Sequence, residues 1–224
     1  MRRLLPALLG LALAVPATAQ SQFADSTGYY ASVDAVPIAY LGNGSGVRLG
    51  TGVEIGRRFG NGFDAGLRAS YLTNEARATS WSAGATAGLS RPAPFGTVAR
   101  LQAAASYSEV SYDYTGFQYS STGLAGDVAA TVGRSFPLVG SLRVRPTVGV
   151  FGTAYRTLSA DASVELRPQD ETRFDAGVQI ELPLTFRLFG TDAAVVGQYR
   201  ISPRSGSPLL REGAFPGGGF RLNF

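Results

Sequence analysis

Residues 174–188 read FDAGVQIELPLTFRL, and hydrophobic residues occupy every second position of this stretch. In an α-helix, successive apolar residues of this pattern would lie about 200° apart and would cover both faces. A β-strand places all of them on one face and leaves Asp175, Gln179 and Glu181 together on the other. The pattern therefore predicts a strand with one apolar face and one polar face.

The same alternation recurs along the chain. It is found at residues 29–40, 47–55, 63–71, 81–89, 97–107, 124–132, 142–150, 193–199 and 218–224. Ten strands are thus predicted, with eight as the alternative if the first stretch and one other do not form strands. Pro37, Pro146 and Pro183 cannot donate a backbone hydrogen bond, so we expect them near strand ends or at bulges.

The connections between these stretches alternate in length. Short, turn-forming segments occur at 60–62, 91–94, 137–140 and 189–192, and longer ones at 108–122, 157–172 and 202–213. Short turns at one end and longer loops at the other are typical of transmembrane β-barrels with an even number of strands. We therefore predict an all-β fold, a closed antiparallel up-and-down transmembrane barrel.

The first residues resemble a secretory signal peptide. Arg2 and Arg3 precede an apolar stretch from Leu4 to Val15, and small residues follow at Ala17 and Ala19. This order predicts cleavage after Ala19, with residues 1–19 as the signal peptide and 20–224 as a single barrel domain. The chain lacks Cys, so an exported product would have no disulfide bond to hold it together.

The composition fits a barrel in a bilayer better than a soluble one. The chain is 45% hydrophobic and 16% charged, yet beyond residue 20 it has no apolar run of the ~18–20 residues that a spanning helix needs. In a soluble, lipocalin-like barrel the polar face of each strand would meet water. Here that face is rich in glycine, which suits a narrow, curved lumen. Its glycines include Gly50, Gly52, Gly56, Gly66, Gly84, Gly88, Gly133, Gly149 and Gly177.

Aromatic residues cluster near the expected strand ends. Transmembrane barrels carry such residues in two girdles at the membrane interfaces. The candidates are Tyr29, Tyr30, Tyr40, Phe59, Phe63, Tyr71, Trp81, Phe95, Tyr107, Tyr155, Phe186, Phe189 and Tyr199. Some of them could instead be ordinary core aromatics.

The whole predicted mature chain resembles a small Gram-negative outer-membrane β-barrel. Its last strand resembles the barrel-assembly signal of that class through Gly219, Phe220, Leu222 and the terminal Phe224, although Gly217 stands where a polar residue is usual. The resemblance implies an outer-membrane location and contact with the barrel-assembly machinery during biogenesis. Outer-membrane lipid and lipopolysaccharide are the partners it implies, and it names no specific member of the class.

Several kinds of chemistry are excluded by the composition. The chain has no His, Lys or Cys, so all 20 basic residues are arginines. Without His, the Ser-His-Asp type of hydrolase site cannot form, and without Lys there is no Schiff base or phosphate-binding P-loop. The arginines form no basic run, so nucleic acid is not an expected partner. We expect no enzyme activity, cofactor or metal.

The polar faces carry charges of both signs, which we expect to meet in a narrow lumen. These residues are Arg48, Glu54, Asp64, Arg68, Arg100, Asp127, Arg143, Arg145, Asp175, Glu181, Arg187 and Arg200. A turn centred near Asn61 would place Glu54 opposite Arg68, and a similar hairpin would bring Arg100 near Asp127. Buried charges must pair, so the simplest prediction is a salt-bridge network that plugs the barrel. A polar conduction path and paired-carboxylate catalysis remain as alternatives.

The function expected from the sequence is therefore non-enzymatic. The leading hypothesis is an integral outer-membrane barrel with a structural or surface-interaction role, in which the outside loops could bind a partner. The alternatives are a narrow passive pore for small solutes and a soluble lipocalin-like binder with an apolar interior.

Overall fold

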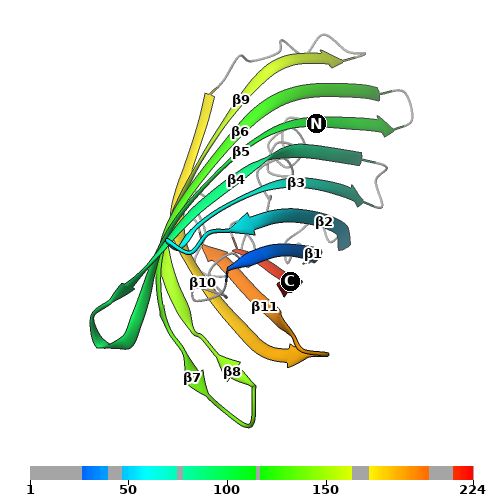
Figure 1. Cartoon of the computed structure of the whole chain (residues 1–224). Coiled ribbons are helices and arrows are strands. Elements are labelled where there is room, and N and C mark those ends of the chain that lie inside the picture. Colours follow the sequence, from blue (N-terminus) through cyan, green and yellow to red (C-terminus); the bar gives the residue numbers. More distant parts are fainter. Residues whose placement is uncertain are drawn as a thin grey trace.

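The computed structural model describes residues 27–39, 47–74, 78–114, 117–162, 172–201 and 214–223, which form one continuous sheet (Figure 1). No helix in these residues is long and apolar enough to cross a membrane. The strands are β1 Gly28–Ala39, β2 Val47–Arg58, β3 Phe63–Asn74, β4 Ala78–Ala93, β5 Thr97–Tyr114, β6 Phe117–Arg134, β7 Phe136–Pro137, β8 Arg143–Val144, β9 Thr147–Ala162, β10 Thr172–Leu188, β11 Thr191–Ile201 and β12 Ala214–Asn223. A single 3₁₀ turn, η1 Pro94–Gly96, joins β4 to β5.

The sheet closes on itself as a barrel. Each long strand pairs antiparallel with the next, and β12 pairs with both β11 and β1. The two-residue strands β7 and β8 extend the hairpin between β6 and β9, and Figure 1 shows them projecting from one end. The wall therefore consists of ten long strands, which confirms the prediction of a closed antiparallel ten-stranded barrel.

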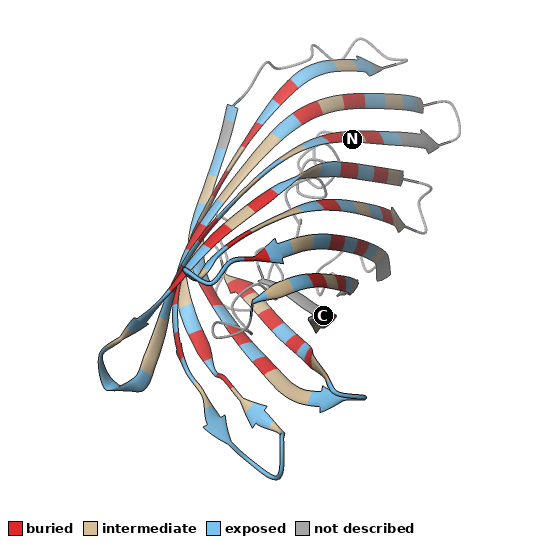
Figure 2. Ribbon diagram, viewed as in Figure 1, coloured by how far each residue is buried: buried red, intermediate tan, exposed pale blue. Residues whose placement is uncertain are grey.

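Apolar side chains point outward and polar ones point inward. Along β2, Val53 and Ile55 are 49% and 62% exposed, whereas Glu54 between them is 1% exposed. Buried and exposed bands alternate in the same way along the other long strands (Figure 2). A soluble barrel has the opposite arrangement, so the lipocalin-like alternative is wrong.

Inward glycines allow the close approach of neighbouring strands. At Gly177 on β10, a Cβ atom would collide with the carbonyl oxygen of Ile201 on β11. Gly84 and Gly149 have the same relationship with backbone oxygens of the adjacent strands. These contacts explain why the inward face of the strands is rich in glycine.

The prolines lie where a backbone hydrogen bond can be missing. Pro37 lies beyond the last β1–β12 pair, Ala35 with Gly218, and Pro146 lies between β8 and β9. Pro183 lies inside β10, where that strand changes partner from β9 to β8. There the Arg145 N–H donates to the Pro183 carbonyl oxygen at 3.0 Å.

The connections differ in one respect from the sequence-based prediction. Residues 108–122 are not a long loop, because β5 continues to Tyr114 and β6 begins at Phe117. The prediction that long and short connections alternate along the whole chain is therefore wrong. The extra length lies in the strands, since β4, β5, β6 and β9 are 16–18 residues long and β1, β2 and β3 are 12.

Candidate functional site: the polar lumen

We call the end of the barrel with the connections at 59–62, 94–96, 135–146 and 189–190 the turn end, and the opposite end the loop end. The charged side chains of the lumen are concentrated toward the turn end. Six side chains there are each at most 3% exposed, and we call them the turn-end cluster. They are Tyr30, Glu54, Arg58, Asp64, Arg100 and Arg221. They come from β1, β2, β3, β5 and β12, so closure of the barrel is needed to assemble the cluster.

Asp64 is the main acceptor of this cluster. Arg100 donates to its two carboxylate oxygens from NH1 at 2.6 Å and from NH2 at 2.8 Å, and also donates to the Ser90 hydroxyl at 2.8 Å. The Arg58 Nε atom lies 4.0 Å from the same carboxylate. Such a two-pronged contact between guanidinium and carboxylate is both strong and geometrically specific.

Glu54 is the second acceptor of the cluster. Its Oε1 atom accepts hydrogen bonds from the Tyr30 hydroxyl at 2.8 Å and from the Thr86 hydroxyl at 3.1 Å. The guanidinium of Arg221 lies over the Tyr30 ring, 3.6 Å from its centroid. A cation at this distance from an aromatic face is attracted by the ring's electrons. The terminal strand β12 is thereby tied to β1, β2 and β4 through side chains as well as through its backbone.

A separate ion pair joins β11 to β6 across the intervening strands β10 and β9. Arg200 donates to Asp127 from NH1 at 2.8 Å and from NH2 at 3.2 Å, and Asp127 also accepts from the Thr153 hydroxyl at 3.0 Å. The Arg200 guanidinium lies 4.5 Å from the centroid of the Phe151 ring. This pair therefore forms a brace across one side of the lumen.

Smaller polar side chains surround these charges. Gln179 donates to Glu181 at 3.2 Å on β10, and Arg145 is buried near that strand. A small cavity of about 30 Å³, partly open to solvent, lies against β3–β6 and β9. Its lining includes the polar residues Arg68, Ser82, Thr86, Ser106, Asp127 and Thr153. The lumen is thus filled unevenly, with its largest buried side chains in the turn-end cluster.

The structure places the predicted interior residues in three groups. The buried group consists of Glu54, Asp64, Arg68, Arg100, Arg145, Glu181 and Arg200. The partly buried group consists of Asp127 and Asp175, and the exposed group of Arg143 and Arg187. Arg143 and Arg187 are not interior residues because they lie at the turn end, where the barrel wall ends. The Arg187 Nε atom lies 3.5 Å from Asp192 in an exposed pair. The side chain of Arg48 lies outside the described residues.

Two expected pairings have different outcomes. Glu54 does lie opposite Arg68 in the β2–β3 register, as expected from a tight turn. Arg100 does not lie near Asp127, because the β5–β6 register pairs Asp127 with Ala104 and Arg100 with Thr131. The reason is the position of the turn, because Tyr114 pairs with Phe117, and a pairing of Arg100 with Asp127 would need a turn two residues earlier in the chain.

Sequence reasoning missed three members of the turn-end cluster. Arg58 continues the inward series that contains Glu54, and Arg221 lies between Phe220 and Leu222 in the terminal strand. The alternation could therefore have identified both arginines. Tyr30 was assigned to an interfacial girdle, but it is 2% exposed and points into the lumen.

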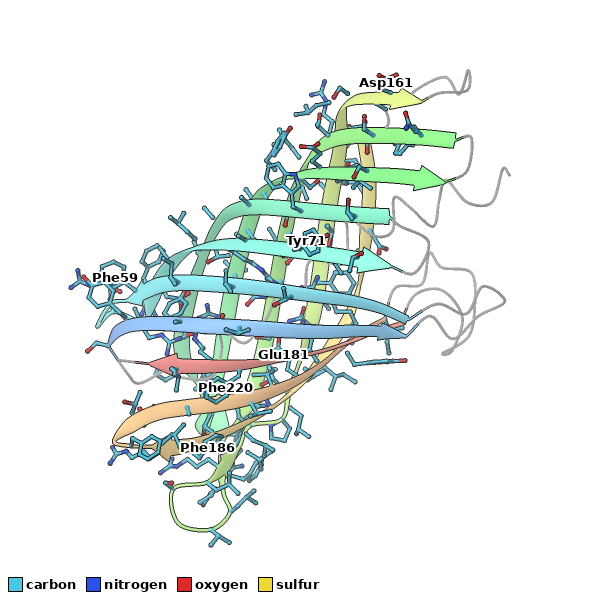
Figure 3. The ribbon with its side chains drawn as sticks, turned by 90° about the vertical axis from the view of Figure 1, so that its right-hand side faces the viewer. Phe59, Tyr71, Asp161, Glu181, Phe186 and Phe220 are labelled. Carbon is cyan, nitrogen blue, oxygen red and sulfur yellow. The ribbon has the colours of Figure 1, made fainter. Side chains whose placement is uncertain are left out.

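The outward aromatic residues form two bands on the barrel. Tyr29, Phe59, Phe63, Phe95 and Phe189 are exposed at the turn end, and Tyr71, Trp81 and Tyr107 are exposed nearer the loop end. Figure 3 shows Phe59 and Tyr71 in these two positions. On β3, the rise of ~3.3 Å per residue and a tilt of about 40° separate Phe63 from Tyr71 by about 20 Å along the barrel axis. This is close to the height of an outer-membrane apolar band.

Tyr155, like Tyr30, differs from the expected girdle assignment. It is buried in the lumen, whereas Phe186 and Tyr199 are partly buried. Tyr40 lies outside the described residues. Trp81 and Tyr107 pack together with ring centroids 5.6 Å apart, which strengthens the band nearer the loop end.

The lumen offers hydrogen-bonding and ionic groups more than reactive ones. The carboxylates of Glu54, Asp64, Asp127 and Glu181 accept hydrogen bonds from arginine, tyrosine, threonine or glutamine side chains. Among the described residues there is no cluster of three or more side chains able to hold a metal ion. The arrangement is suited to closing or lining a narrow passage.

No protein-family model matches the chain, and no curated protein matches it in sequence. Among solved structures, it is similar to the translocator domain of the autotransporter NalP from Neisseria meningitidis, with a TM-score of 0.64 and 13% identity. That similarity covers 98% of this chain and 97% of the other. The β domain of the Bordetella autotransporter BrkA gives a TM-score of 0.48 at 13% identity, covering 89% and 100% of the two chains.

The attachment invasion locus protein Ail of Yersinia pestis gives a TM-score of 0.31 at 11% identity, covering 88% of this chain and 97% of that one. At 13% identity the likeness to the NalP domain is one of fold alone, and it extends over nearly all of both chains. The fold agrees with the apolar outer face and the two aromatic bands, which suit lipid and its interfaces. Together they identify the fold as a closed β-barrel of the type found in Gram-negative outer membranes.

Proposed function

We propose that the chain is a non-enzymatic outer-membrane barrel whose lumen is plugged at the turn end, and which serves a structural or surface-interaction role. The observation that carries this proposal is the burial of the turn-end cluster. Glu54, Arg58, Asp64 and Arg221 are at most 2% exposed, although each carries a charged group. Side chains this inaccessible leave little open space around them.

Electrostatics supports a stable plug. Moving a charge out of water costs several kcal/mol, and a well-placed partner is needed to offset that cost. Arg100 and Asp64 satisfy each other through two hydrogen bonds, and Glu54 accepts two more. Opening a wide channel here would expose or separate these partners, so the cluster resists displacement.

The loop end supports the surface-interaction part of the proposal. Strands β5 and β6 continue past the band of Tyr71, Trp81 and Tyr107 to Tyr114 and Phe117. Hydroxyl pairs on this extension, Thr79 with Ser111 at 2.7 Å and Thr122 with Ser159 at 2.6 Å, join β4, β5, β6 and β9. Figure 3 shows Asp161 at the loop end of β9. The result is a polar, hydrogen-bonded platform beyond the apolar band.

Three partners follow from this placement and remain part of the proposal. A second protein could bind the platform, and the exposed Arg156 beside it could contact lipopolysaccharide phosphates, which arginine binds well. The barrel-assembly machinery would recognise Gly219, Phe220, Leu222 and Phe224. Phe220 and Leu222 flank the buried Arg221 and so share the outward face of β12, whereas Phe224 lies outside the described residues.

A narrow passive pore is the second candidate. The cavity that opens to solvent beside Arg68 and Asp127 favours it, as does the excess of buried arginines. Among the described residues, the lumen holds six buried arginines and five buried or partly buried carboxylates. The arginines are Arg58, Arg68, Arg100, Arg145, Arg200 and Arg221, and the carboxylates are Glu54, Asp64, Asp127, Asp175 and Glu181. Such a pore would favour small anions, because the lumen has more positive than negative groups.

Planar-bilayer recording of the refolded full chain tests the two candidates. The plugged barrel predicts no reproducible single-channel conductance for the wild type and measurable conductance for Tyr30→Ala/Arg221→Ala, which removes two large side chains from the cluster. Arg187→Ala is the control, because Arg187 is exposed, and it should remain silent. Heat-dependent gel mobility verifies that each variant has folded. Reproducible wild-type conductance would overturn the plug and support the pore.

A further inference from the structure

An arginine precedes a phenylalanine at each of the four connections at the turn end. The segments are Arg57-Arg58-Phe59-Gly60, Arg91-Pro92-Ala93-Pro94-Phe95-Gly96, Arg134-Ser135-Phe136-Pro137 and Arg187-Leu188-Phe189-Gly190. Arg57, Arg91, Arg134 and Arg187 are exposed, and so are the four phenylalanines. We call these eight residues the turn-end belt. Because four separate hairpins contribute to it, the belt extends around the barrel.

Two of the phenylalanines have a backbone that is unfavourable for a bulky residue. Phe95 has φ 61° and Phe189 has φ 50°, in the left-handed region where glycine or asparagine is usual. Their side chains are 88% and 98% exposed. In water each would combine backbone strain with an exposed ring, and strained residues of this kind tend to occur at functional positions. An aromatic ring in this position suits the interface between lipid and water.

The charge of this region is almost entirely positive. Arg143 on β8 adds a fifth exposed arginine to the four of the belt. Around these turns, Asp192 is the one exposed carboxylate in the described part of the chain, and it pairs with Arg187. Asp64 also lies near this end, but it is buried against Arg100. The exposed surface at the turn end therefore attracts anions.

The rings hold some of the arginines in place. The Arg57 guanidinium lies 5.4 Å from the Tyr29 ring centroid and 5.3 Å from that of Phe59. The Arg134 guanidinium lies 5.5 Å from the Phe136 ring centroid. Stacking of this type restrains the side chain but leaves the N–H groups at its edge able to donate hydrogen bonds. Both arginines are thus arranged to bind an oxygen anion beside an aromatic ring.

The position of the belt indicates which anion it meets. Ile55 precedes Arg57 by two positions on the outward face of β2, and Val132 precedes Arg134 in the same way on β6. These two apolar side chains are 62% and 41% exposed. The arginines therefore lie at the edge of the apolar band, at the level of lipid headgroups. We propose that the turn-end belt binds the phosphate groups of anionic phospholipids in the leaflet that surrounds the turns.

This inference rests on the outer-membrane placement of the barrel and does not depend on whether its lumen is plugged. Each arginine should increase the affinity for an anionic lipid roughly fivefold, as expected for a cation close to a charged membrane surface. The Arg91 guanidinium donates to the Asn61 carbonyl oxygen and Arg187 pairs with Asp192. Arg57 and Arg134 are therefore the clearest residues to test.

The experiment compares lipid retention by the refolded full chain. The protein is reconstituted with equal amounts of phosphatidylglycerol and phosphatidylcholine, and the lipids that remain bound after mild detergent are identified by native mass spectrometry. The wild type should retain phosphatidylglycerol in preference. In Arg57→Gln/Arg134→Gln, the ratio of retained phosphatidylglycerol to phosphatidylcholine should fall roughly fivefold for each arginine replaced. Arg57→Lys/Arg134→Lys should keep most of it, because the charges remain.

Arg68→Gln is the matched control, because Arg68 is buried in the lumen and does not face lipid. It removes the same charge and should leave the preference unchanged, and heat-dependent gel mobility verifies that the variant has folded. An equal loss in Arg68→Gln would overturn the proposal in favour of a general charge effect. So would an unchanged preference in Arg57→Gln/Arg134→Gln. Loss of lipid binding in the presence of inorganic phosphate at physiological ionic strength would instead indicate a free-phosphate site and would also overturn it.

Discussion

Arg100 on β5 reaches across β4 and binds both carboxylate oxygens of Asp64 on β3, at 2.6 and 2.8 Å. The pair can form because the β4 residue between the two side chains is Gly88. A Cβ atom at that position would collide with the guanidinium of Arg100 and lie 2.8 Å from Asp64 Oδ1. An inward glycine thus provides the space that two large charged side chains occupy in a narrow barrel.

Replacing Asp64 with Asn should destabilise the barrel strongly. The substitution keeps the shape but removes the charge, so Arg100 and Arg58 lose the carboxylate they share. Breaking one side of a buried pair costs about 3–5 kcal/mol. Urea unfolding in lipid vesicles, followed by heat-dependent gel mobility, measures the change. Asp192→Asn removes the exposed pair with Arg187 and should cost less than about 1 kcal/mol. Equal costs for the two variants would contradict the importance of burial.

Replacing Gly88 with Ala should act through the same ion pair. The added methyl group would displace the Arg100 guanidinium from Asp64, so the free energy of unfolding should fall. In an Asp64→Asn background the pair is already broken, and the cost of Gly88→Ala should be smaller by about 0.5–3 kcal/mol. A double-mutant cycle measures this coupling. Simple additivity of the two substitutions would show that Gly88 matters for another reason.

Gly177 and Gly197 provide a matched comparison on adjacent strands. A Cβ atom at Gly177 would collide with the Ile201 backbone oxygen, whereas a Cβ atom at Gly197 would have no neighbour within 4 Å. Gly177→Ala should therefore lower the free energy of unfolding by about 1–3 kcal/mol, as expected for overpacking. Gly197→Ala should be neutral or slightly stabilising, because alanine reduces the freedom of the unfolded chain. The same unfolding assay tests both substitutions.

Trp81 is the single tryptophan of the chain and reports on the outer face. It is 43% exposed on the outward side of β4 and packs on Tyr107. In vesicles made with lipids brominated near the headgroup its fluorescence should be strongly quenched, because the ring lies at the edge of the apolar band. Acrylamide, which remains in the water, should quench it weakly. Strong acrylamide quenching with no effect of bromine would contradict the assignment of this face to lipid.

The same probe can be moved to the turn end. Phe189→Trp in a Trp81→Phe background places the fluorophore at a strained, exposed turn position. Quenching there should be strongest for lipids brominated near the headgroup, because the belt lies at the interface. Quenching by deeply brominated lipid alone would place this turn inside the bilayer.

The architecture of this protein was accessible from its sequence. Period-two alternation in ten stretches predicts ten strands with opposite faces, because side chains of a strand point alternately to its two sides. The orientation of these faces also follows, since a face rich in glycine and charge fits a narrow lumen and an apolar one fits lipid. The opposition of Glu54 and Arg68 needed only one tight turn, so local geometry was sufficient.

The charge pairings were decided by the tertiary structure. Arg100 binds Asp64 two strands away, and Arg200 binds Asp127 across β10 and β9. Which side chains meet across a lumen depends on the register of every intervening hairpin and on the curvature of the wall. The β5–β6 turn lies two residues later in the chain than a pairing of Arg100 with Asp127 requires, so Arg100 lies opposite Thr131 instead. Closure between β1 and β12 then brought Arg221 onto Tyr30, a contact between opposite ends of the chain that no local pattern encodes.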